Sequence, residues 1–238
     1  MNEQNVHKKL PRLYINAPLN AGAEIPFEKA QAHYLHNVLR QNIGDKLRVF
    51  NGRDGEWLCR IDDINKKSGS ARAEECLHPQ PSKPIGITLL CAPIKKHRMD
   101  FMIEKAVELG ANGIHPVLTQ NTEIRKINEE RINQQIIEAT EQCERLDLPQ
   151  LKPLAPLNKA LGAYTHIYAA IERAKDIPHI GEIPPTDGAA LLIGPEGGFT
   201  AEECDILRSS QNVIPVSLGQ QILRAETAAL YGLSFLNR

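Results

Sequence analysis

The sequence predicts a chain of two parts: a small, mostly β domain followed by an α/β domain with a largely parallel sheet. Three observations predict this architecture. Short strand-like segments with turn residues between them fill positions 1–77, three prolines fall within residues 78–84, and strand-like and helix-like segments alternate from residue 87 onward. With 238 residues and 42% hydrophobic content, the chain can bury a full core.

The first part reads as short strands with one helix among them. Turn signals such as Asn51-Gly52 separate the strand-like segments. Leu35, Val38 and Leu39 share one helical face, and Gly44 follows the end of that pattern. We therefore expect strands at 13–15, 46–50, 56–64 and 70–77, and a helix at 27–40.

Residues 78–84 read His-Pro-Gln-Pro-Ser-Lys-Pro. Prolines at this density favour an extended, semi-rigid connection over a helix or a central strand. We expect a linker here, between one domain at 1–77 and another at 85–238.

Beyond the linker, strands alternate with helices, which is typical of a largely parallel sheet. The segment 176–187 contains three prolines and is expected to form a surface loop. We expect helices at 99–109 and 128–143, and strands at 87–92, 114–118, near Leu151, and at 166–170, 189–193 and 213–217.

Two loops in this second part are the most specific features of the sequence. The first, Gly194-Pro195-Glu196-Gly197-Gly198-Phe199, follows an apolar strand and precedes a helix that Thr200 and Glu203 open as a capping box. The second, Leu218–Arg224, follows another apolar strand and precedes a helical pattern. Both loops would open at the carboxyl ends of strands, where open α/β sheets bind ligands.

The chemistry of these loops has alternatives. The first is not a nucleotide P-loop, because no Gly-Lys-Ser/Thr follows, and by itself it also fits a structural corner that needs positive φ. Arg224 stands before a helix start, where a guanidinium can stabilise negative charge developing on a substrate. A salt bridge to Glu226 or another acidic residue is the other role, and the two can coexist. No spacing indicates a nucleophilic triad.

The charge is distributed unevenly along a chain whose net charge is −1. Residues 1–98 carry 16 Lys+Arg against 10 Asp+Glu, whereas the remainder carries 12 against 19. Such asymmetry suggests that the first part meets a polyanion, although a solvated mixed surface is the alternative. Lys95-Lys96-His97-Arg98 forms a basic cluster that could contact a phosphate backbone or form a solvated turn.

The sequence also indicates where the protein works, the state of its cysteines and whether it binds a metal. No apolar run reaches the length of a membrane span and the first residues carry no signal pattern, so we expect a cytoplasmic protein. The five cysteines are scattered and include no Cys-x-x-Cys pair, which indicates reduced thiols. His33 and His36 are three residues apart, but no third ligand lies nearby in sequence, so no metal site is expected.

At these motifs the chain resembles the SPOUT-class RNA methyltransferases, and within them the family that methylates N3 of a uridine in bacterial small-subunit (16S) ribosomal RNA. The resemblance spans nearly the whole chain, and its last two blocks are the most specific. It is carried by Pro11-Arg12-Leu13-Tyr14, His33-x-Leu35-x-x-Val38-Leu39-Arg40, Gly44-Asp45, Lys105–Gly110 with Ile114 and Pro116, Glu138-Ala139, Glu141–Arg145, Ile193–Phe199, and Leu218-Gly219-x-x-Ile222–Ala228.

The resemblance implies an N-terminal PUA-like β-barrel for RNA and a C-terminal SPOUT domain tied in a trefoil knot. It further implies S-adenosylmethionine bound in the knot and a homodimer as the active unit. The chain departs from the family at Gln221, where Arg is usual, and at Tyr34, which replaces a second His beside His33. If the family Arg contacts RNA, that contact is weakened or supplied elsewhere here.

The site residues follow from these loops and this resemblance. Arg224 is the expected catalytic residue, which stabilises charge on the uracil carbonyl oxygens while a base or water removes the N3 proton. Loop amides, including those of Gly194, Gly197 and Gly198, are expected to wrap adenine and ribose. The expected cofactor-binding residues are Glu172, Gly194, Glu196, Gly197, Gly198, Leu218, Gly219, Ile222 and Leu223. The expected RNA-binding residues are Arg12, Arg40, Arg48, Arg53 and Arg60, with Lys95, Lys96 and Arg98 secondary.

Two other classes of protein remain open from the sequence. A non-catalytic RNA-binding or ribosome-assembly factor would keep the fold without the chemistry, which the intact glycine loop and Arg224 disfavour. An enzyme acting on a small nucleotide would not need the basic first domain, so deleting residues 1–77 would spare its activity.

Overall fold

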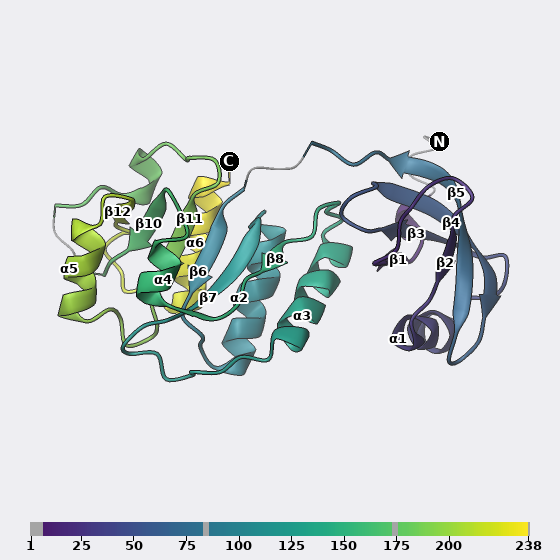
Figure 1. Ribbon diagram of the computed structural model, residues 1–238, viewed down its shortest axis with the longest axis horizontal. Helices are drawn as coiled ribbons and strands as arrows, with labels where there is room; N and C mark the ends of the chain where they lie inside the picture. The colour runs from purple at the N-terminus through teal and green to yellow at the C-terminus, as the bar shows by residue number, and fades with distance from the viewer. Residues whose placement is uncertain (1–6, 83–85, 173–175, 238) are drawn as a thin grey trace. The chain divides into compact units, whose positions relative to one another are not determined.

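The computed structural model describes residues 7–82, 86–172 and 176–237 (Figure 1). The chain divides into two compact units, of which one comprises Met1–Lys83 with Thr140–Leu148 and the other comprises Pro84–Ala139 with Pro149–Arg238. Residues 83 and 84 of the expected linker lie outside the described residues. Each unit has its own sheet.

The described residues of the first unit form a five-stranded, curled sheet in the order β1-β3-β4-β5-β2 (Figure 1). β1 and β3 are parallel, and the other pairs are antiparallel. Leu13, Ile25, Leu35, Leu47 and Ile61 are buried in its core. The elements are η2 (His7–Lys9), β1 (Arg12–Tyr14), β2 (Glu24–Pro26), α1 (Lys29–His33), η3 (Tyr34–Val38), β3 (Lys46–Phe50), β4 (Glu56–Ile64) and β5 (Gly69–His78).

In place of the single helix expected at 27–40, the chain forms a short α-helix followed by a π-helical turn. α1 ends at His33, and η3 continues as a π-helical turn in which the Leu39 N–H donates to the Tyr34 carbonyl oxygen at 3.0 Å. Arg40 then takes a positive φ of 56°, which ends the helical path. The apolar spacing identified Leu35 as buried, but Val38 on the predicted face is exposed, because sequence spacing does not encode the wider π-helical turn.

The second unit contains a seven-stranded sheet whose main path runs β12-β10-β11-β6-β7-β8, with β9 paired to β7. All the pairs within it are parallel, as the alternation of strands and helices predicts. Its strands are β6 (Thr88–Cys91), β7 (Gly113–Leu118), β8 (Gln150–Leu151), β9 (Ala155–Pro156), β10 (Ile167–Ala170), β11 (Ala190–Ile193) and β12 (Val213–Val216). The helices are α2 (Lys96–Glu108), α3 (Glu129–Gln142), α4 (Leu157–Leu161), η4 (Ile180–Glu182), α5 (Ala201–Ser209) and α6 (Ala225–Leu236), and the end of α3, from Thr140, belongs to the first unit.

α6 packs closely on the middle of this sheet, against β11 and β6 (Figure 1). The helix approaches so closely at Gly232 that a Cβ there would lie 2.6 Å from Cδ2 of Leu191 in β11. All four residues of β11 are buried, as expected for a strand covered on both faces. This packing fixes α6, and with it Arg224 at the helix N-terminus.

The strand order explains why distant loops meet. β10 lies between β12 and β11, and all three strands run in the same direction, so their carboxyl ends share one edge of the sheet. Ile171 and Glu172 follow β10, the first glycine loop follows β11, and the second follows β12. Because β10 is the middle strand of the three, Glu172 lies between the two glycine loops.

Candidate functional site

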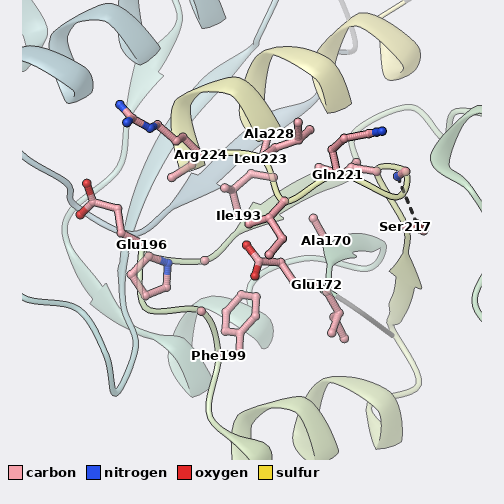
Figure 2. Close-up of a pocket in the computed structure, with 18 of the residues that line it drawn as sticks. Ala170, Glu172, Ile193, Glu196, Phe199, Ser217, Gln221, Leu223, Arg224 and Ala228 are labelled. Carbon is pink, nitrogen blue, oxygen red and sulfur yellow. Dashed lines mark hydrogen bonds between the residues drawn. The ribbon is translucent and has the colours of Figure 1, made fainter. Parts of the chain in front are cut away.

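The three loops enclose a pocket of about 700 Å³ (Figure 2). Its apolar lining includes Ala170, Ile193, Phe199, Leu223 and Ala228. The pocket also contains most of the residues that the sequence singled out. Those that line it are Glu172, Gly194, Glu196, Gly198, Leu218, Gly219, Ile222, Leu223 and Arg224.

The first glycine loop is a tight turn that uses one of its own amides. The Gly198 N–H donates to the Pro195 carbonyl oxygen at 2.9 Å, and Gly198 has a φ of +68°. The expectation that this amide wraps the cofactor is therefore wrong, because the turn already uses its hydrogen. At Gly194, a Cβ would lie 3.1 Å from the Phe199 ring, so any other residue there would displace the ring slightly.

Gly197 is expected in the cofactor set but does not line the pocket. The Asn121 side chain, on the loop after β7, donates through Nδ2 to the Gly197 and Gly198 carbonyl oxygens at 3.1 Å each. The sequence does not single out Asn121, because its only signal is its place after an apolar strand. Gly197 thus contributes to the shape of the loop rather than to the wall of the pocket.

The capping box that the sequence predicted at the start of α5 is confirmed, and it also reaches the loop after β7. Glu203 accepts from the Thr200 N–H at 3.0 Å and from the Gln120 N–H at 2.8 Å, while the Thr200 hydroxyl accepts from the Glu203 N–H. The loop after β7 is thereby held against both the glycine turn and the helix that follows it.

The second glycine loop presents its backbone to the pocket. Gly219 has a φ of +109°, and its N–H donates to Ser217 Oγ at 3.2 Å, shown as the dashed line in Figure 2. In the described part of the chain, no hydrogen bond is formed by the N–H groups of residues 220–223. These amides are available to a ligand that offers acceptors.

Arg224 occupies the N-cap position of α6 and is exposed. Figure 2 shows it on the same side of the pocket as Glu196, with Gln221 on the opposite side. The salt bridge to Glu226 that competed with a catalytic role is absent from the described residues, in which Glu226 pairs with Arg98. Among the described residues Arg224 forms no ion pair, so its guanidinium is available to a substrate.

Arg12 and Arg48 require a correction to the expected RNA-binding set. Arg12 is buried, with Nε 2.5 Å from Glu56 Oε1, Nη1 bonded to the Thr140 carbonyl oxygen at 2.9 Å, and its guanidinium 3.8 Å from the centre of the Phe50 ring. Arg48 is equally buried beside the same glutamate. Neither guanidinium faces solvent, so neither can contact a phosphate; they hold the first unit together.

A second partner of Arg48 is Glu144. Arg48 Nη2 donates to Glu144 Oε1 at 2.7 Å, and this hydrogen bond lowers the pKa of the Glu144 carboxyl, while partial burial opposes the shift. Arg12 and Arg48 therefore belong to one ion-pair network with Glu56 and Glu144.

The other expected RNA contacts are accessible to different degrees. Arg40 and Arg53 are exposed. Arg60 is exposed but donates through Nε to Glu74 at 2.5 Å. In the basic cluster, Lys95 and Lys96 are exposed, whereas Arg98 lines the pocket and is bound by Glu196 at 2.5 Å. Arg98 is thus placed with the cofactor residues rather than with the lysines.

The fold and the site define the class of protein. The model of an RNA methyltransferase domain matches residues 81–237, and that of an RNA methyltransferase PUA domain matches residues 27–74. The chain therefore belongs to the RNA methyltransferase family.

The names of individual relatives specify a narrower class of protein than the family models do. Ribosomal RNA small subunit methyltransferase E of Rickettsia conorii is 37% identical, over 95% of this chain and 94% of the relative. Among solved structures, the methyltransferase Lpg2936 of Legionella pneumophila, in complex with bound SAM, is 30% identical with a TM-score of 0.84, and the match covers 96% and 97% of the two chains. Ribosomal RNA small subunit methyltransferase E of Neisseria gonorrhoeae, bound to S-adenosyl methionine, is 29% identical over 94% and 95%, with a TM-score of 0.81.

These similarities confirm the resemblance to the ribosomal RNA methyltransferases and the α/β fold with a PUA-like N-terminal part. The helices in the described residues include none long and apolar enough to cross a membrane.

Proposed function

We propose that this chain methylates N3 of a uridine in small-subunit ribosomal RNA, with S-adenosylmethionine as the methyl donor. The observation that carries the proposal is the pocket at the strand ends, where an exposed arginine stands beside a loop with unpaired amides. Two relatives named ribosomal RNA small subunit methyltransferase E, one of them with bound S-adenosyl methionine, match the chain over almost its whole length. They support small-subunit ribosomal RNA as the substrate and S-adenosylmethionine as the donor.

The residues present fit the donor. A cavity of about 700 Å³ lies within the range typical of small-ligand sites. The amides of residues 220–223 can donate to adenine nitrogens, and Ile193, Phe199 and Leu223 supply apolar surface for the ring. Glu172 is exposed just after β10 and lines the pocket, and we propose that its carboxylate accepts hydrogen bonds from the ribose hydroxyls. Glu196 adds a negative charge on the side of the pocket that holds Arg224.

The chemistry assigns a role to Arg224. S-adenosylmethionine supplies a methyl group bound to a positively charged sulfur. Uracil N3 attacks that carbon after its proton passes to a base or water, a C–N bond forms, and the C–S bond breaks to leave a neutral sulfide. Loss of the N3 proton places negative charge on the flanking carbonyl oxygens, which the Arg224 guanidinium stabilises.

Positioning supplies much of the rate, since N3 must lie in line with the S–CH3 bond. α6 is fixed on β11 through Gly232, so the Arg224 backbone is held at the pocket mouth. We propose that the first unit holds the RNA. The proposed divisions of the chain are a β domain at 1–77, a linker at 78–84 and a methyltransferase domain at 85–238.

The RNA contacts we propose are the exposed cations Arg40, Arg53, Arg60, Lys95 and Lys96. In η3, the helical segment that precedes Arg40 in sequence, Tyr34 and Val38 are 44% and 58% exposed. Exposed aromatic and apolar side chains beside cations suit unstacked bases on a charged backbone.

We further propose that the protein works in the cytoplasm as a homodimer whose second unit is knotted, and that its substrate is the small subunit or its RNA. Light scattering on the purified protein tests the dimer. A mass near that of a single 26.5 kDa chain would contradict it.

The test of the function is transfer of a labelled methyl group from S-adenosylmethionine to ribosomal RNA, offered free and in small subunits. We expect label at N3 of one uridine, mapped by digestion and mass spectrometry. RNA binding without transfer would favour an assembly factor. Activity that survives deletion of residues 1–77 would favour an enzyme of small nucleotides.

A further inference from the structure

Arg98 connects two parts of the pocket that lie far apart in sequence. It comes from the first turn of α2, and its Nη1 lies 2.5 Å from Oε1 of Glu196 in the first glycine loop. Its Nε lies 3.7 Å from Oε1 of Glu226, in the first turn of α6. One guanidinium thus joins the glycine loop after β11 to the helix that begins at Arg224.

The Glu226 carboxylate is buried, so water cannot easily replace Arg98 as its partner. The Glu226 side chain is 11% exposed, and its Oε2 is buried without a hydrogen-bond partner in the described residues. Within that part of the chain, Arg98 is the cation paired with Glu226. A buried carboxylate without a partner is strongly disfavoured, so removing Arg98 should push Glu226 and the start of α6 away from their positions.

We infer that Arg98 is a positioning residue, and that the Glu196–Arg98–Glu226 bridge holds the first glycine loop against the start of α6 and so forms the donor pocket. This inference rests on the proposed function. It replaces the expectation that Arg98 contacts RNA, because two carboxylates already bind its guanidinium.

The bridge also sets the place of the proposed catalytic residue. Arg224 is two positions before Glu226, at the cap of the same helix. Holding Glu226 therefore fixes the distance between Arg224 and the glycine loop. Loss of the bridge should weaken donor binding and also slow turnover, since geometry at the reacting atoms would loosen.

The experiment compares Arg98→Gln and Arg98→Lys with a matched control, Arg131→Gln. Arg131 pairs with Asp100 on α2, the same helix that carries Arg98, and that pair has similar exposure, 32% and 28% against 25% and 33%. Arg131 does not line the pocket. Each variant is assayed for thermal midpoint, for S-adenosylmethionine affinity by calorimetry, for RNA affinity by filter binding, and for kcat and donor KM on ribosomal RNA.

We expect Arg98→Gln to bind the donor about tenfold more weakly than the unmodified protein. The donor affinity of Arg98→Lys should lie between these two, because a lysine ammonium lacks the fork of N–H groups with which a guanidinium reaches both carboxylates. Arg131→Gln should shift the thermal midpoint without changing donor affinity. The effects of Glu196→Gln and Arg98→Gln on donor affinity should not add, since each variant breaks the same bridge.

Donor affinity of Arg98→Gln within twofold of the unmodified protein would overturn the inference, whatever its thermal midpoint. So would a loss of RNA affinity alone, which would return Arg98 to the RNA-binding set. If the unmodified protein fails to bind the donor, the proposed function itself fails, and the two failures are therefore distinguishable.

Discussion

Asn121 holds the first glycine loop from outside the pocket: its Nδ2 lies 3.1 Å from the carbonyl oxygen of Gly197. The same nitrogen bonds the carbonyl oxygen of Gly198 at an equal distance. Because β7 and β11 are separated by β6 in the sheet, this contact joins loops from non-adjacent strands. The orientation of two successive peptide groups thus depends on one side-chain amide.

Replacing Asn121 with Asp should weaken donor binding. The isosteric carboxylate turns a donor into an acceptor that faces two carbonyl oxygens, at a cost of about 1–2 kcal/mol, or roughly tenfold in the dissociation constant. Calorimetry with S-adenosylmethionine measures the effect. Asn65→Asp is the control, since Asn65 also bonds a turn, to Ser68, but in the first unit. Equal affinities for both variants would show that Asn121 has no part in the pocket.

Gly198→Val should abolish donor binding. Gly198 lines the pocket with a φ of +68°, which a β-branched residue adopts at a cost of about 1–2 kcal/mol, and the new side chain adds bulk to the site. Gly22→Val is the matched control, because Gly22 has a φ of +81° and open space around it but belongs to the first unit. The control should lose stability in urea unfolding and keep donor affinity. Full donor affinity in Gly198→Val would contradict the assignment.

Arg224→Ala should retain donor binding and lose turnover. The guanidinium acts on charge that appears only as N3 loses its proton, so its removal should reduce kcat by about 10²- to 10³-fold. Single-turnover methylation with saturating RNA measures the loss, and calorimetry with S-adenosylmethionine checks that the pocket is intact. An unchanged kcat would remove Arg224 from the mechanism.

The sequence predicted much of the fold because local patterns encode it. β3 and β4 have the predicted bounds, since turn residues delimit them on both sides. The capping box of Thr200 likewise depends on residues three apart. By contrast, α4 and β2 escaped prediction because elements of five and three residues carry too little periodicity to be recognised.

The errors at the candidate site have a common cause, which is that side-chain partners lie far away in sequence. Arg12 was expected at the RNA surface, but Glu56 and the Thr140 carbonyl oxygen bury it. Arg98 belongs to the RNA-binding set expected from the sequence, but Glu196 and Glu226 bind it. Glu172 and the glycine loops were found because strand ends can be read locally and parallel strands share their carboxyl edge.

RNA affinity should distinguish exposed from buried arginines. Arg40→Ala removes an exposed cation, so we expect the slope of log Kd against log salt to fall by roughly 0.7–0.9. Arg12→Gln should leave the slope unchanged and lower the free energy of unfolding by about 3–5 kcal/mol, because Glu56 would stay buried without that partner. Filter binding over a range of salt concentrations, with urea unfolding alongside, measures both. A smaller slope for Arg12→Gln would return Arg12 to the RNA surface.

Acid should weaken the ion-pair network through Glu144. The hydrogen bond from Arg48 holds the pKa of Glu144 below its ordinary value of 4.5. A carboxyl whose pKa is lower in the folded state contributes stability above the unfolded pKa and loses it as pH falls through the folded pKa. The difference in urea midpoint between the unmodified protein and Glu144→Gln should therefore be present at pH 7 and shrink below about pH 4.5. A difference that does not change with pH would exclude this linkage.

The most direct test of the central claim is a crystal structure of the protein grown with S-adenosylhomocysteine, the product of methyl transfer. We expect the adenine against the amides of residues 220–223 and the sulfur facing the side of the pocket that holds Arg224. Ligand density at another place on the chain, or none in crystals grown at saturating ligand, would contradict the assignment of this pocket as the methyl-donor site.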